Sequence, residues 1–297
     1  MITKKRILHW AGSGFAIVGV GFVALRLRDH WSSLDLSQIS PVAWLVIAGL
    51  AILYGLASSL LFTLTWWNLL KSFDIHVARL WAFHVYGVSQ LAKYVPGNIF
   101  HLAGRQVMGM SVGAPSGKLL KSIIWELGLA ATAGSMYGWL ILPAILPEFS
   151  SLLSIILLVL FVGVAVFLLS RLFGLLVSKA FGSLLLLQAI SGGIFAILLD
   201  VIARDSQFSS QTWLLIGGSY IIAWLVGLVT PGAPAGAGVR ELILLLLLKS
   251  IVKEADLLVA VVLGRIITVL GDVLFFMMAF LIPSKLYQKP VQENIHE

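Results

Sequence analysis

The chain contains repeated apolar runs of about 20 residues, of which residues 152–169 form the most continuous. A helix rises ~1.5 Å per residue, so a run of this length crosses a hydrocarbon core of ~30 Å. A transmembrane β-barrel would instead need short strands of alternating polarity. Only 11% of the residues are charged, whereas soluble domains carry roughly 25%. The sequence therefore predicts an all-α polytopic membrane protein and excludes a water-soluble globular enzyme.

Six runs are long enough for full spans, and we expect these spans at residues 7–27, 42–70, 119–142, 152–169, 181–203 and 257–282. The first run follows a basic start, and no small-residue cleavage site comes after it. It is therefore expected to be a retained span rather than a cleaved signal peptide.

Two further apolar stretches are interrupted by proline and glycine. Residues 80–108 are broken at 95–98 (Val-Pro-Gly-Asn), and residues 212–252 are broken at 231–238 (Pro-Gly-Ala-Pro-Ala-Gly-Ala-Gly). Irregular backbone at membrane depth survives only where protein buries it or where it faces water. We therefore expect two re-entrant (broken) helical hairpins in addition to about six full spans. Kinks in ordinary helices are the alternative, above all for the second stretch, whose first arm could span.

Basic residues are concentrated in alternate connecting segments. By the positive-inside rule both termini are expected in the cytoplasm, with the protein in the cell (inner) membrane. The net charge of +7 is scattered between apolar runs, so no nucleic-acid partner is expected. The inner segments hold Lys4, Lys5, Arg6, Lys71, Arg79, Lys118, Lys121, Arg171, Lys179, Lys285 and Lys289 against Asp74, Glu293 and Glu297. The outer segments hold Arg26, Arg28, Arg204, Lys249 and Lys253 against Asp29, Asp35, Glu148, Asp205, Glu254 and Asp256.

The two interrupted stretches occupy matching places in the chain. The same separation takes Pro96 to Pro231 and Arg105 to Arg240, and a long apolar run follows each stretch. The single transmembrane domain, 1–297, would then consist of two inverted repeats, 1–150 and 151–297. Paired interrupted segments of this kind indicate a substrate site near the midplane of the bilayer.

The returning arm of each hairpin would point its free N–H groups toward the membrane centre, where they favour an anion. Asn98 is suited to cap the first arm, and the glycines of the second stretch allow close approach to the backbone. Arg105 and Arg240 add guanidinium groups suited to phosphate or carboxylate oxygens. The alternative for each arginine is that its side chain extends to a membrane interface.

Further ionisable residues lie within predicted spans and are expected to face a partner or a wet cavity. Glu126 and Arg265 have comparable depths, so they either pair with each other or line the path. Arg265 and Asp272 share a helix face, which also allows a water-linked network. Lys93, His101 and Gln106 are weaker candidates. The full set of expected substrate-binding residues is Pro96, Gly97, Asn98, His101, Arg105, Glu126, Pro231, Gly232, Gly236, Gly238, Arg240, Glu241, Arg265 and Asp272.

Residues 93–99, Gly104-Arg105 and 231–241 resemble the signature segments of the lysylphosphatidylglycerol synthase transmembrane region, a flippase-like membrane protein family. The resemblance implies movement of lipids between leaflets. It assigns Pro96, Gly97 and Arg105 to the first motif, and Pro231, Gly232, Gly236, Gly238 and Glu241 to the second. The segment 233–235 (Ala-Pro-Ala) departs from the usual shorter glycine-rich step. Only about 15 residues follow the last predicted span, so aminoacyl-tRNA-dependent transfer is not implied.

The leading hypothesis is a lipid translocase rather than an enzyme, with membrane lipids and envelope-biosynthesis enzymes as partners and no cofactor. A proton- or ion-coupled transporter of a small anion, with Glu126 or Asp272 as the titrating group, is the alternative. A membrane-embedded transferase on lipid-linked substrates is less favoured, because the acidic residues are too well separated in sequence for a carboxylate cluster that holds Mg²⁺.

Overall fold

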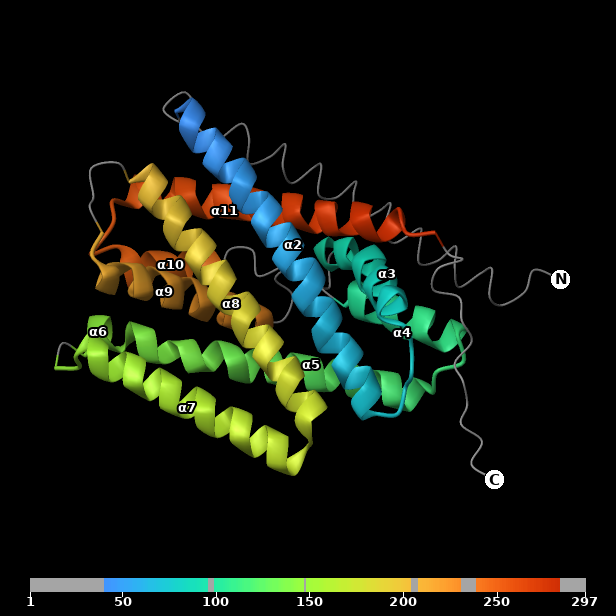
Figure 1. Ribbon diagram of the computed structural model, residues 1–297. Coiled ribbons are helices and arrows are strands. Elements are labelled where there is room, and N and C mark those ends of the chain that lie inside the picture. Colours follow the sequence, from blue (N-terminus) through green and yellow to red (C-terminus); the bar gives the residue numbers. More distant parts are fainter. Residues whose placement is uncertain (1–39, 96–98, 147, 204–207, 231–238, 284–297) are drawn as a thin grey trace.

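The structure is a computed structural model that describes residues 40–95, 99–146, 148–203, 208–230 and 239–283. Within these ranges every regular element is helical (Figure 1). The first part contains α2 (Pro41–Ser72), α3 (Arg79–Gln90), the 3₁₀ helix η2 (Leu91–Tyr94), α4 (Phe100–Ser111), α5 (Ser116–Met136), the 3₁₀ helix η3 (Tyr137–Ile141) and α6 (Leu142–Ile145). The second part contains α7 (Ser151–Leu172), α8 (Leu175–Ile202), α9 (Ser210–Val229), α10 (Val239–Leu248) and α11 (Glu254–Phe280).

Six helices in the described residues are long and apolar enough to cross a membrane: α2, α5 continued through α6, α7, α8, α9 and α11. The prediction of an all-α polytopic membrane protein is therefore confirmed. Five of the six predicted spans correspond to these helices, and the span predicted at 7–27 lies outside the described residues. The sixth helix is α9, which is the first arm of the second interrupted stretch. This arm alone is long enough to span.

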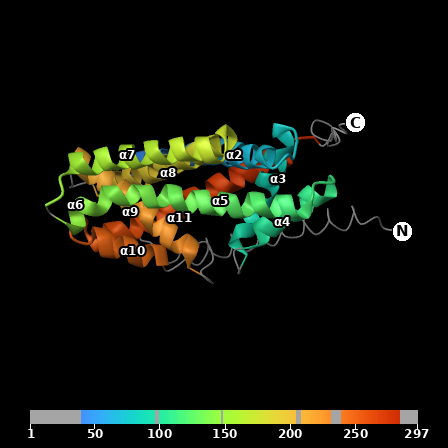
Figure 2. The ribbon, with the colours of Figure 1, turned by 90° about the horizontal axis from the view of Figure 1, so that it is seen from below.

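The helices that flank the two interruptions extend to opposite ends of the molecule. In Figure 1, α3 and α4 lie at the right-hand end, where α2 and α11 end, whereas α9 begins and α10 ends at the left. Figure 2 shows that α4 and α10 lie on the same face of the bundle, opposite α7 and α8. The arrangement is the one expected of an inverted repeat, although the repeat and the re-entrant character of the stretches stay predictions.

Charged residues near the helix ends are divided between the two ends of the bundle. One end carries Lys71, Asp74 and Arg79 around the connection of α2 to α3, Lys118 and Lys121 at the start of α5, and Arg171 and Lys179 around the connection of α7 to α8. The other end carries Glu148 before α7, and Lys249, Lys253, Glu254 and Asp256 around the connection of α10 to α11. The more basic end is the one that the positive-inside rule assigns to the cytoplasm.

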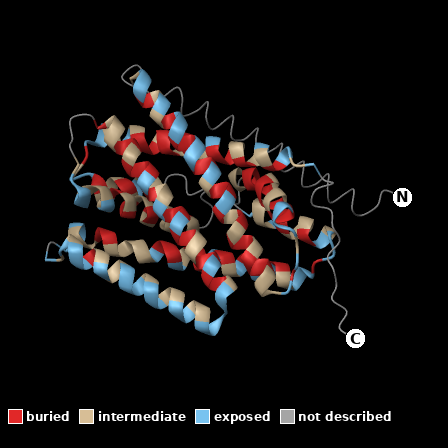
Figure 3. Cartoon of the chain, in the orientation of Figure 1, coloured by how far each residue is buried: buried red, intermediate tan, exposed pale blue. Residues whose placement is uncertain are grey.

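The predicted repeats 1–150 and 151–297 do not form separate bodies. Helix α2 packs on α8 and α11, α5 packs on α8 and α9, and α11 also packs on α3. Helix α7 contributes little to this shared core: Ser154 is its single buried residue, and the rest of its surface is largely exposed (Figure 3). The centre of the bundle is thus built jointly by helices from both halves of the chain.

Helices α2 and α11 cross in close contact at two glycines. A Cβ atom on Gly271 would lie 2.9 Å from the backbone nitrogen of Gly55 and 2.5 Å from Cδ1 of Tyr54. A Cβ atom on Gly55 would lie 3.0 Å from the carbonyl oxygen of Gly271. No side chain larger than hydrogen fits between the two backbones here. The crossing brings Tyr54 and Asp272, the chain neighbours of these glycines, to the same level of the bundle.

Candidate functional site

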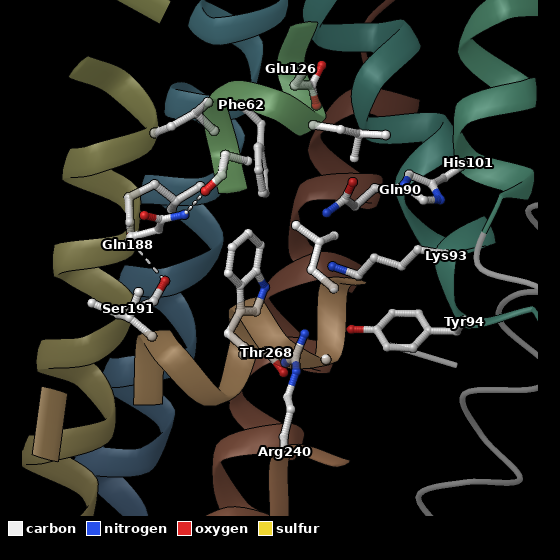
Figure 4. Close-up of a pocket in the computed structure, with 18 of the residues that line it drawn as sticks. Phe62, Gln90, Lys93, Tyr94, His101, Glu126, Gln188, Ser191, Arg240 and Thr268 are labelled. Carbon is white, nitrogen blue, oxygen red and sulfur yellow. Dashed lines mark hydrogen bonds between the residues drawn. The ribbon is translucent and has the colours of Figure 1, made fainter. Parts of the chain in front are cut away.

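A cavity of about 440 Å³ lies between the helices, with a wall drawn from α2, α3, η2, α4, α5, α8, α9, α10 and α11 (Figure 4). Residues on either side of both interruptions line it: Tyr94 and Ile99 at the first, Thr230 and Arg240 at the second. The two interrupted stretches, predicted to meet at one site, therefore border the same cavity. Several predicted site residues lie outside the described residues, and their roles stay predictions: Pro96, Gly97, Asn98, Pro231, Gly232, Gly236 and Gly238.

Arg105 on α4 lines the cavity but is bound to a carboxylate. Its Nη1 donates to Oε2 of Glu126 on α5 at 2.6 Å, and the Tyr86 hydroxyl donates to the other Glu126 oxygen at 2.7 Å. The guanidinium carbon lies 4.3 Å from the centroid of the Tyr86 ring. Arg105 is only 1% exposed, so its side chain does not extend to an interface. The charge that was expected to bind substrate is already balanced.

Of the two alternatives for Glu126 and Arg265, the pairing is wrong, and both residues instead line the cavity. Helix α4 turns back beside α5 with Gly109 packed against Leu119, and this close contact holds Arg105 next to Glu126. Arg265 lies on α11 and has a different partner. Comparable depth along two helices was a poor guide, because it does not say which helices are neighbours.

Asp272 on α11 is completely buried and binds the end of the first interrupted stretch. Lys93 Nζ lies 2.6 Å from Asp272 Oδ2, and Gln90 Nε2 donates to Oδ1 at 3.1 Å. The Tyr94 hydroxyl also donates to Asp272. The partners of Asp272 thus come from α3 and η2 rather than from Arg265 on its own helix, as the shared helix face had suggested. Lys93, a weaker candidate in the sequence, is part of the site.

Arg265 is held by Glu241. Its Nε donates to Glu241 Oε1 at 2.5 Å, which joins α11 to α10. Arg265 lines the cavity, whereas Glu241 is not among the lining residues. In the structure the Glu241 carboxylate holds the Arg265 side chain at the wall, and its predicted role in substrate binding stays a prediction.

Arg240, at the start of α10, differs from the other cationic residues of the wall. Its guanidinium points into the cavity in Figure 4 and has no ion pair or hydrogen bond with any described residue. Lys93, Arg105 and Arg265 each face a carboxylate. Of the four cationic residues that line the cavity in the described ranges, Arg240 is therefore the one whose charge has no carboxylate partner among the described residues.

Two polar residues of α4 have different outcomes. His101 lines the cavity, and its Nδ1 is buried with no hydrogen-bond partner in the described ranges. Gln106 is not part of the wall, because its side-chain amide donates to the backbone oxygen of Ser116 at 2.8 Å. His101 is thus retained as a candidate and Gln106 is assigned to the connection between α4 and α5.

Several lining residues were missed by sequence reasoning. Gln188 donates its amide N–H to the backbone oxygen of Ala130 at 2.9 Å, across α8 and α5. The position of this glutamine inside an apolar run could have indicated a site residue. The aromatic residues gave no such indication, because aromatic residues in a span usually pack in the core. The missed lining residues with polar groups are Tyr54, Tyr86, Gln90, Tyr94, Gln188, Ser191, Tyr220, Trp224, Thr230 and Thr268.

The cavity reaches the outer surface of the bundle at apolar residues. Ile99 is 60% exposed and Val229 is 62% exposed, yet both also line the cavity. They lie next to the first and second interruptions, respectively. The charged interior is therefore bordered by an apolar rim.

No protein-family model matches the chain, and no curated protein matches it. The resemblance to the lysylphosphatidylglycerol synthase transmembrane region stays a prediction. In the part of the chain that the structure describes, no three His, Asp or Glu side chains lie close enough to hold a metal ion together.

Proposed function

We propose that this protein is a lipid translocase that moves an anionic, phosphate-bearing lipid between the leaflets, with the lipid headgroup in the central cavity. The six apolar helices make the chain a multi-pass membrane protein. The observation that carries the finer proposal is the unbalanced charge of Arg240.

An unpaired charge inside a membrane protein has a large desolvation cost, which an opposite charge and its hydrogen bonds offset. Lys93, Arg105 and Arg265 have carboxylate partners within the protein. Arg240 has none among the described residues, and its guanidinium offers several N–H donors to the cavity. An anionic group that enters the cavity would supply the missing partner. A phosphate or carboxylate can accept two parallel hydrogen bonds from one guanidinium.

The apolar rim favours a lipid over a water-soluble anion. A headgroup at Arg240 is close to the interruptions, next to which Ile99 and Val229 are exposed. The acyl chains would pass over these side chains and stay in the bilayer. Their transfer from the bilayer to water would cost about 0.8 kcal/mol per CH₂. A small hydrophilic anion gains nothing from such a rim.

The proposal is tested by transbilayer movement of fluorescent phosphatidylglycerol in proteoliposomes, measured by chemical quenching of the outer leaflet. Arg240→Gln should lower the rate at least about tenfold, since a hydrogen-bonded charge contributes roughly 1.5–3 kcal/mol. Because Arg240 has no carboxylate partner among the described residues, its replacement leaves no buried carboxylate unpaired there, and the variant should fold. Arg171→Gln is the matched control, since Arg171 is exposed and lies over Phe167 at the bundle surface. Equal rates for Arg240→Gln and the natural protein would refute the proposal.

A second candidate is a proton-coupled transporter of a small anion, favoured by the completely buried Asp272 carboxylate, which binds Gln90, Lys93 and Tyr94 of the cavity wall. Uptake of radiolabelled phosphate into the same proteoliposomes, driven by a pH gradient and abolished when the gradient is collapsed, would support it. Lipid movement without gradient-driven phosphate uptake would reject it.

A further inference from the structure

Four tyrosines among the described residues line the cavity, and the hydroxyl groups of two of them make no hydrogen bond with any described residue. Tyr86 donates to Glu126, and Tyr94 donates to Asp272. Tyr54 and Tyr220 make no hydrogen bond through the hydroxyl with any described residue, although both line the wall. Tyr54 is only 8% exposed. Because the two hydroxyl groups have no hydrogen-bond partner among the described residues of the cavity wall, they are available to a ligand.

Both rings are held in place by their neighbours. Tyr220 on α9 stacks on Phe195 of α8, with ring centroids 4.8 Å apart. Tyr54 lies against Gly271, where an added Cβ would come within 2.5 Å of its Cδ1 atom. Two donors with fixed rings lose little conformational freedom when they bind a ligand, which increases their contribution to affinity.

Tyr54 and Tyr220 line the same cavity as Arg240. The three side chains come from three helices, α10, α9 and α2. A group bound at Arg240 would therefore meet donors from more than one direction.

We propose that Tyr54 and Tyr220 are specificity-determining residues that, with Arg240, select a phosphoryl group. This inference rests on the proposed function, because it assigns the headgroup chemistry of the same site. A phosphoryl group presents oxygens around a tetrahedral centre, so one guanidinium and two hydroxyls from separate helices can each bind oxygen. A carboxylate has two oxygens in one plane, which the guanidinium alone satisfies. The two tyrosines therefore contribute to phosphoryl binding and little to carboxylate binding.

The inference is tested by equilibrium binding to the purified full-length protein in detergent. The probes are dihexanoyl-phosphatidylglycerol, the hemisuccinate of dihexanoylglycerol as a carboxylate with the same acyl chains, and inorganic phosphate. Tyr54→Phe and Tyr220→Phe should each weaken binding of the phosphatidylglycerol about tenfold, the usual effect of one hydrogen bond to a charged group. Binding of the hemisuccinate should change less than about twofold on the same reasoning. Tyr137→Phe is the matched control, since the Tyr137 hydroxyl donates to the backbone oxygen of Leu185 outside the cavity.

The outcomes separate this inference from the proposed function. If both phenylalanine variants bind phosphatidylglycerol normally while Arg240→Gln does not, the headgroup site stands and the role of the tyrosines is wrong. If Arg240→Gln also binds normally, the proposed site itself is wrong. Inorganic phosphate that binds as tightly as the lipid, with the same dependence on Tyr54 and Tyr220, would support phosphoryl selection and reject a lipid ligand. Equal losses for the phosphoryl and carboxylate lipids would overturn the selectivity.

Discussion

Lys93 and Asp272 form an ion pair of 2.6 Å that joins η2 in the first half of the chain to α11 in the second. Lys93 is 20% exposed at its side chain, whereas Asp272 has no exposure. Tyr94 and Gln90 donate to the same carboxylate, so one acidic residue holds both the end of α3 and η2. The position of the first interruption relative to the cavity therefore depends on a residue of the opposite half.

Asp272→Asn should destabilise the protein, because it leaves Lys93 without a carboxylate in a largely buried position. Breaking a buried ion pair from one side costs about 3–5 kcal/mol, and the partial exposure of Lys93 places the expected loss near the lower end. The measurement is thermal unfolding in detergent. Asp74→Asn is the control, since it makes the same chemical change in the exposed pair with Lys118 and should shift the midpoint little. Similar shifts for both variants would contradict the role given to Asp272.

Arg105 and Glu126 should behave as a structural pair rather than as separate ligand groups. Arg105→Met and Glu126→Gln should each cost about 3 kcal/mol, since each leaves one buried charge unpaired. The double variant should lose about 2 kcal/mol less than the sum, because neither charge remains. Tyr86 keeps an acceptor in the glutamine. Denaturant unfolding gives this coupling energy, and the double variant should retain lipid movement. A stable double variant without activity would instead give Arg105 a direct part in binding.

Gly271→Ala should test the contact between α2 and α11. The new methyl group would meet Tyr54 and the backbone of Gly55 at distances that no Cβ atom tolerates. Overpacking of this kind costs about 1–3 kcal/mol. Gly49→Ala on α2 is the control, since nothing lies within 4 Å of its added Cβ, and alanine is the better helix former by up to about 1 kcal/mol. Unfolding midpoints should fall for the first variant and hold or rise for the second.

The predicted orientation is open to direct labelling, because the natural chain contains no cysteine. Ser116→Cys and Ser210→Cys place single thiols at exposed positions that begin α5 and α9. A membrane-impermeant maleimide added to intact cells should label the thiol at 210, and label that at 116 only after permeabilisation. The reverse pattern would show that the charge-based orientation is inverted.

The sequence was most informative about apolar length and about interruption. Five spans were predicted correctly, because continuous burial in hydrocarbon requires runs of about 20 apolar residues. The two proline- and glycine-containing breaks were recognised because they interrupt such runs. Residues on both sides of each break line the cavity.

The partners within the site could not be predicted in the same way. Glu126 binds Arg105 and not Arg265, because neighbouring helices are decided by packing that hydropathy does not record. Tyr54 and Tyr220 gave no signal, since an aromatic residue in a span is typical of a packed core. Arg240 was found because a charge next to a helix break is rare in an apolar chain.

The contact of Gly55 with Gly271 limits how α2 and α11 can move relative to each other. Backbones that touch at one point cannot slide past it without a clash, but they can pivot about it. Residues next to the pivot, including Tyr54 and Asp272, are displaced least by such a rotation, and the distant helix ends are displaced most. A pivot of this kind lets the helix ends move apart or together at either end of the bundle, while Tyr54 and Asp272 beside the crossing keep their geometry.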